Sequence, residues 1–138
     1  MKLFLCSLLF SFCITNINAQ ITTDADLVGK WKVIKIKDLV KKRTEAETKK
    51  IAEAIKAFEQ ATFTFGADKK FTFQIPIEAL QIKSAFWSLD TAKGIINIAA
   101  SVKSKNKADI MQIDYKSGSG ITMFLMPDTG LALKMEKF

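Results

Sequence analysis

The chain has 138 residues, and its 21 basic and 14 acidic side chains give it a formal charge of +7 at pH 7. It contains no histidine, and both of its cysteines lie near the start of the chain. These facts exclude a Cys–His or Ser–His nucleophile and the common zinc sites from the rest of the chain. The length is sufficient for one domain with one hydrophobic core.

Residues 1–19 have the pattern of a secretory signal peptide, which would leave 20–138 as the mature domain. A single Lys2 precedes the apolar run LFLCSLLFSFCI, and the segment ends at the small residue Ala19. The run is too short for a membrane span, and the residues before Cys13 make a poor lipobox. We therefore expect export to the periplasm or the extracellular space, without a lipid anchor. Cleavage after Ala19 or a few residues away would remove both cysteines, and with them any disulfide.

The segment Leu27–Asp38, LVGKWKVIKIKD, predicts the first strand. Trp31, Val33 and Ile36 alternate with lysines, as in a strand with one buried face. The alternation slips where Val33 and Ile34 stand together. A β-bulge would absorb the slip and bend the strand, as barrel closure requires. The polar residues that precede this segment are expected to form a loose arm.

A helix is expected to begin at Thr44, which with Glu47 makes a capping box. The apolar residues at 51, 54, 55 and 58 share one face, which predicts a single amphipathic helix of about four turns. The apolar stripe is narrow and rich in alanine, which favours docking on a barrel over binding to a membrane. Whether the helix plugs an end of the barrel or lies along its wall stays open.

From Ala61 onward the apolar residues recur with period two. Phenylalanines alternate with threonines on both sides of the turn 66–70, which predicts a hairpin with an aromatic face, ended by Pro76. Turns rich in Gly, Asp and Ser separate the remaining strands, which are expected at 82–89, 95–102, 110–115, 121–126 and 131–135. Together these elements predict an all-β fold: an eight-stranded antiparallel up-and-down barrel with one α-helix between strands 1 and 2.

A family resemblance rests on Gly29, Lys30 and Trp31, which form a G-x-W on the first strand of this meander. The combination resembles the calycin and lipocalin pattern. In length and export signal the chain is similar to the lipocalin-like domain family of small secreted bacterial proteins. The aromatic hairpin and the segment Trp87–Gly94 also resemble that family.

Two features depart from the lipocalin pattern. A typical lipocalin has its helix after the barrel, whereas here the helix follows the first strand, as in fatty-acid-binding proteins. In lipocalins an arginine near the C-terminus usually covers the first-strand tryptophan. The only arginine here is Arg43, so the resemblance assigns that place to Lys134.

An eight-stranded barrel is just wide enough to be filled by side chains or to hold one small ligand. Both alternatives stay open for the residues that are expected to face inward. These candidate cavity residues are Phe63, Phe65, Phe71, Phe73, Trp87, Met111, Ile113, Tyr115 and Met123. Tyr115 is the expected polar contact, because a buried hydroxyl usually finds a partner.

Enzyme chemistry has little support in the sequence. The acids Asp90, Asp109, Asp114 and Asp128 fall at turns or at positions expected to face outward, and nothing marks a catalytic carboxylate pair. The methionines of the mature chain lie on predicted strands, which favours core packing over copper(I) binding. We therefore expect no enzyme activity, no metal and no cofactor.

Basic residues gather at 35–43 and again at 103–107. We interpret them mainly as solubilising, with steering of an anionic ligand as the alternative; no nucleic-acid motif accompanies them. The first hypothesis is thus a secreted, non-enzymatic barrel that binds a small apolar or amphipathic molecule, such as a lipid, without inserting into a membrane. The second is a filled barrel that binds a protein through Lys41, Lys42, Arg43 and the following helix, as an envelope interaction module or an inhibitor.

Overall fold

The computed structural model describes residues 21–106 and 108–138. The predicted signal peptide, both cysteines, Gln20 and Lys107 of the second basic group lie outside the described residues. Within the described residues, no helix has the length and apolar character needed to cross a membrane.

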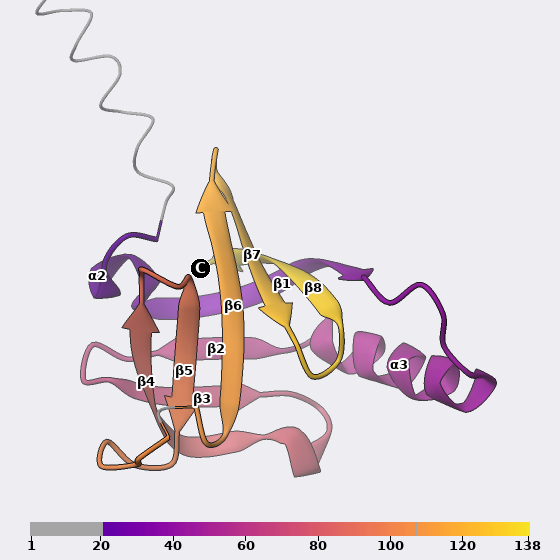
Figure 1. Ribbon diagram of the computed structural model, residues 1–138, viewed down its shortest axis with the longest axis horizontal. Coiled ribbons are helices and arrows are strands. Elements are labelled where there is room, and N and C mark those ends of the chain that lie inside the picture. Colours follow the sequence, from indigo (N-terminus) through magenta and orange to yellow (C-terminus); the bar gives the residue numbers. More distant parts are fainter. Residues whose placement is uncertain (1–20, 107) are drawn as a thin grey trace, which may run out of the picture.

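Eight antiparallel strands form a closed barrel in which each strand pairs with its sequence neighbours and the last returns to the first (Figure 1). The strands are β1 (Gly29–Asp38), β2 (Thr62–Phe65), β3 (Lys70–Gln74), β4 (Ile82–Asp90), β5 (Ile95–Ala99), β6 (Met111–Gly118), β7 (Ile121–Met126) and β8 (Leu131–Lys137). The helical elements are α2 (Asp24–Leu27), α3 (Glu45–Phe58) and the 3₁₀ turn η1 (Glu78–Leu80). The predicted up-and-down barrel with a helix between the first two strands is confirmed.

The predicted bulge in β1 is also confirmed. Val33 pairs with Met135 and Lys35 with Lys134, so Ile34 is the extra residue on β1. Its side chain is 49% exposed, whereas Val33 is buried. The bulge thus keeps the apolar face of β1 on the core on both sides of the slip.

Helix α3 closes one end of the barrel with its last turn. The Thr44 hydroxyl accepts a hydrogen bond from the Glu47 N–H at 3.2 Å, which is the Thr44 half of the predicted capping box. At the other end of α3, Phe58 is buried and its ring centroid lies 5.9 Å from that of Phe73. The earlier turns extend away from the barrel (Figure 1), and Ile51 and Ile55 are only partly buried against the core. The helix therefore plugs the end with its C-terminus alone.

Helix α2 lies at the opposite end, and the expectation of a loose arm before β1 is wrong. The Asp26 carboxylate accepts hydrogen bonds from the backbone N–H groups of Thr22 and Thr23, both at 3.0 Å. The turn that results buries Leu27 completely. The Ile21 N–H donates to the Ser117 hydroxyl at 2.6 Å, which ties the arm to β6. The hydrogen bonds of Asp26 and the burial of Leu27 thus order this segment, although most of its side chains are polar.

Interlocking aromatic rings fill the barrel interior. The Phe63 centroid lies 4.6 Å from that of Phe73 and 5.6 Å from that of Phe124. The Phe65 ring centroid lies 5.0 Å from that of Phe71 and 6.1 Å from that of Phe124. All five rings are at most 2% exposed. Rings at these separations contact one another directly, so they pack as a core.

Strand β5 is shorter than predicted. It ends at Ala99, the last residue that pairs with β4, and the predicted strand residue Val102 lies on the following loop with 73% exposure. The pairing with β6 stops at Ile98 and Met111. Beyond Ala99 the chain pairs with neither neighbouring strand, so the apolar residues Ala100 and Val102 do not extend β5.

Candidate functional site

The structure places most of the candidate cavity residues in the core. Those that are buried, with at most 9% exposure, are Phe63, Phe65, Phe71, Phe73, Trp87, Ile113 and Tyr115. Met111 is partly buried and packs against the same core. Burial and, to a smaller extent, the negative charge of Asp90 raise the pKa of Tyr115 above its ordinary value, so its hydroxyl stays protonated at neutral pH.

The inward placement expected for Met123 is wrong. Met123 pairs with Lys116 and Lys134 on the outer face, while its neighbour Phe124 is fully buried. The segment 121–126 is largely apolar in both phases of the strand, so alternation alone could not choose between them. The predicted turn 127–130 could have shown which phase faces inward, because its length pairs Phe124 with the core residue Leu133.

Gly29 and Trp31 of the G-x-W motif close the end of the barrel near α2. The Trp31 indole Nε1–H donates to the Leu27 carbonyl at 2.8 Å. The Lys137 ammonium lies 5.2 Å from the Trp31 ring centroid and donates to the Asp26 carbonyl at 2.7 Å. Gly29 has φ +136°, and a Cβ there would lie 3.2 Å from the Lys137 side chain. The lysine that covers Trp31 is therefore Lys137, which corrects the expectation for Lys134.

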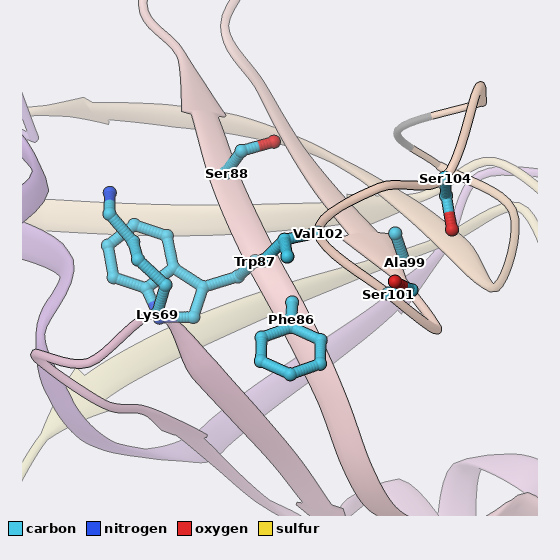
Figure 2. A pocket seen from close by; sticks show the side chains of 8 residues that line it. All are labelled: Lys69, Phe86, Trp87, Ser88, Ala99, Ser101, Val102 and Ser104. Carbon is cyan, nitrogen blue, oxygen red and sulfur yellow. The ribbon is translucent and has the colours of Figure 1, made fainter.

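A pocket of about 240 Å³, which we call the Phe86 pocket, lies on the flank of the barrel (Figure 2). It arises because Lys70, the first residue of β3, and Ala99, the last residue of β5, both pair with Phe86 of β4. Both neighbouring strands therefore stop beside Phe86 and leave its ring only partly covered. The residues that line this pocket are Lys69, Phe86, Trp87, Ser88, Ala99, Ser101, Val102 and Ser104.

Trp87 forms a rigid wall of the Phe86 pocket. Its indole Nε1–H donates to the Gly66 carbonyl at 3.0 Å, and its ring packs edge to face on Phe65 at a centroid distance of 5.8 Å. The Lys69 ammonium lies 4.1 Å from the Trp87 ring centroid and pairs with the Asp24 carboxylate. Figure 2 shows the Lys69 side chain lying against this ring. Lys69 therefore lines the pocket with its ammonium held between the Trp87 ring and the Asp24 carboxylate.

Lys69 adopts a backbone conformation that lysine rarely takes. Its φ of +70° is in the left-handed region, and its N–H donates to the Gly66 carbonyl at 3.0 Å in the β2–β3 turn. A glycine would adopt this conformation at no steric cost. A residue held in this conformation beside a pocket is typical of functional sites.

The opposite wall of the Phe86 pocket is the loop between β5 and β6. The Ser101 hydroxyl accepts from the Lys103 N–H at 3.2 Å, and the Asp109 carboxylate accepts from the Ala100 N–H at 2.8 Å. These bonds fold the loop so that Val102 faces the pocket with the serines beside it (Figure 2). The pocket thus combines apolar walls, hydroxyl groups and one ammonium, and can hold a small molecule with an apolar body and a polar end.

No cluster of three or more His, Cys, Asp or Glu residues that could hold a metal ion occurs in 21–106 or 108–138.

The predicted protein contact included Lys41, Lys42 and Arg43. Of these, Arg43 has a structural role, since its guanidinium donates to the Asp38 carboxylate at 2.9 and 3.0 Å and to the Thr129 carbonyl at 2.7 Å. The Arg43 hydrogen bond lowers the pKa of Asp38. Lys41 and Lys42 remain exposed.

No family model and no curated protein matches the chain. Among solved structures it is similar to a DUF4847 family protein from Bacteroides vulgatus ATCC 8482, with 13% sequence identity and a TM-score of 0.45 over 80% of this chain and 94% of that chain. The closed eight-stranded barrel is consistent with a calycin-like protein. Membership of the lipocalin family stays a prediction.

Proposed function

We propose that the protein is an exported, non-enzymatic binding protein that holds a small amphipathic molecule in the Phe86 pocket. The observation that carries the proposal is the Phe86 ring, left partly uncovered at the point where both neighbouring strands end. The export pattern at 1–19 and the absence of histidine support the rest of the assignment.

The flank of the barrel is favoured over its interior as the binding place. The interior aromatic rings contact one another, and the two ends are covered by Leu27 of α2 and Phe58 of α3. A ligand would have to displace this packing, whereas the Phe86 pocket has room for a molecule without any rearrangement. The ligand class is therefore that of the first hypothesis, but the proposed site is the Phe86 pocket on the flank and not the barrel interior.

The pocket's size and charge define the ligand class. A volume of about 240 Å³ lies just below the range of about 300–1,000 Å³ that is common for ligand pockets, which suits a molecule with a single ring. Its apolar body would lie on Phe86, Ala99 and Val102. A carboxylate would reach the Lys69 ammonium by competing with Asp24, which costs little because the Lys69–Asp24 pair is largely solvent-exposed.

Amide chemical-shift perturbation in NMR spectra tests this proposal, with phenylacetate as the probe and the uncharged phenylacetamide as its control. We expect phenylacetate to shift the amides of Phe86, Ser88 and Val102 and to bind more tightly than phenylacetamide. Phe86→Ala should weaken binding at least ten-fold. Ile121→Ala, which also removes an apolar side chain from the outer face, is the matched control and should leave binding unchanged.

Shifts scattered over the whole surface, or equal binding by the Phe86→Ala and Ile121→Ala variants, would contradict the proposal. Native mass spectrometry of the protein purified from its own host, before and after organic extraction, can supply the natural ligand. A discrete added mass that extraction removes would give its size. That mass should be reduced in the Phe86→Ala variant and retained in the Ile121→Ala variant.

A further inference from the structure

A second surface, separate from the Phe86 pocket, lies along β1. Strand β2 pairs with β1 only from Gly29 to Lys32, whereas β8 pairs with β1 as far as Asp38. Among the described residues, no strand pairs with the β2-side edge of Val33–Asp38. At about 3.3 Å per residue, this edge of β1 is about 20 Å long.

Helix α3 faces this edge and forms a groove with it. A hollow of about 400 Å³ lies between Val33–Ile36 and the side chains of Ile55 and Glu59. A second, of about 370 Å³, lies between the connection that follows β1 and the first turns of α3, and Lys41 and Ile55 line it. Ile55 borders both hollows, which are therefore adjacent, and we call the two together the β1–α3 groove.

The groove combines apolar and basic side chains. Ile34 and Leu39 are each 49% exposed, although both are large and apolar. Lys35 and Lys41 line the groove, and Lys37 is exposed on the same strand. On the acidic side, Glu59 lines the groove, while Asp38 is already bound by Arg43. Positive charge therefore predominates along the open edge.

We propose that the β1–α3 groove binds an extended acidic segment of a partner protein, which adds a strand to the free edge of β1. Strand addition satisfies backbone N–H and C=O groups that otherwise depend on water, and alternate side chains of the segment supply specificity. Lys35 and Lys37 would pair with its acidic residues, while Ile34 and Ile55 would contact its apolar ones. A second copy of this chain fits poorly, because antiparallel pairing of β1 with itself would bring these lysines together.

Fluorescence anisotropy with labelled peptides tests the proposal on the intact protein. The probe is the heptapeptide Glu-Val-Asp-Ile-Glu-Val-Asp with both ends blocked. The control peptide carries lysine in place of every Glu and Asp. We expect the acidic peptide to bind at least ten-fold more tightly. In a third peptide, alternate backbone nitrogens of the acidic sequence are methylated on the edge that would face β1. This peptide should lose binding to a similar extent, because its N–H groups can no longer donate to β1.

The variant Lys35→Glu/Lys37→Glu should weaken binding of the acidic peptide at least ten-fold. Lys103→Glu/Lys105→Glu changes the net charge equally on the other basic group and should change the affinity less than two-fold. Equal effects of the two double variants, or full binding of the N-methylated peptide, would overturn the proposal. Two further results would overturn it. One is a concentration-dependent dimer that covers the edge of β1, and the other is a protein that binds phosphatidylglycerol vesicles but not the acidic peptide.

Discussion

The two faces of β4 differ in how far their aromatic rings are covered. Trp87 and Phe86 are neighbours in sequence, but Trp87 packs on Phe65 in the interior and forms one wall of the Phe86 pocket, while Phe86 projects outward into that pocket. Inside, each ring is in contact with others and is shielded from water. Outside, one ring is uncovered because two strands end beside it. In a barrel of this width large aromatic residues can fill the interior, and the proposed binding site lies instead where two strands end.

The largest effect is expected from breaking the interior. Phe63→Ala removes a fully buried ring that contacts Phe71, Phe73 and Phe124, and should lower the free energy of unfolding by about 3–5 kcal/mol. Phe86→Ala should cost less, about 1–2 kcal/mol, because its ring is already partly exposed. Urea denaturation measures both. Similar losses in the two variants would erase the distinction between the two faces.

A smaller effect is expected at the end of the barrel near α2. Trp31→Phe keeps the ring on Phe124 but removes the Nε1–H donor to the Leu27 carbonyl. The loss should be about 1–3 kcal/mol, because the carbonyl of a buried residue loses its partner. Hydrogen exchange should show the α2 amides opening in this variant. Unchanged protection would mean that the indole bond does not hold α2.

The next prediction concerns pH. Backbone hydrogen bonds from Thr22 and Thr23 lower the pKa of Asp26 below its ordinary value. Asp26 therefore contributes stability that is fully present above the ordinary aspartate pKa of about 4 and is lost as the pH falls through its lower folded value. The difference in unfolding free energy between the protein and Asp26→Asn should shrink between about pH 5 and pH 2. A constant difference would contradict this assignment.

The smallest stability change is expected for Lys69→Gly. Relief of the left-handed backbone should add about 1 kcal/mol, while loss of the cation–π contact and of the exposed ion pair with Asp24 should together remove about 1 kcal/mol, so the effects nearly cancel. Phenylacetate should nevertheless bind several-fold more weakly, with its advantage over phenylacetamide lost. If that advantage persists in Lys69→Gly, the ammonium does not recognise the carboxylate.

Much of the architecture follows from the sequence alone. The period-two segments, the single helix and the turn residues specify the order of the elements, because each depends on neighbours within a few residues. The bulge at Ile34 follows from two adjacent apolar residues in the same way. The aromatic residues of the first hairpin were correctly expected to face inward, since threonine marks the opposite phase.

Tertiary structure decided what lies between elements distant in sequence. The register of β7 on β8 turns Phe124 inward and Met123 outward, although both phases of that segment are largely apolar. Lys137 reaches Trp31 because β8 ends beside the start of β1. The Phe86 pocket and the open edge of β1 arise where strands of unequal length stop pairing. The point at which pairing stops depends on residues of another strand, so local pattern cannot specify these surfaces.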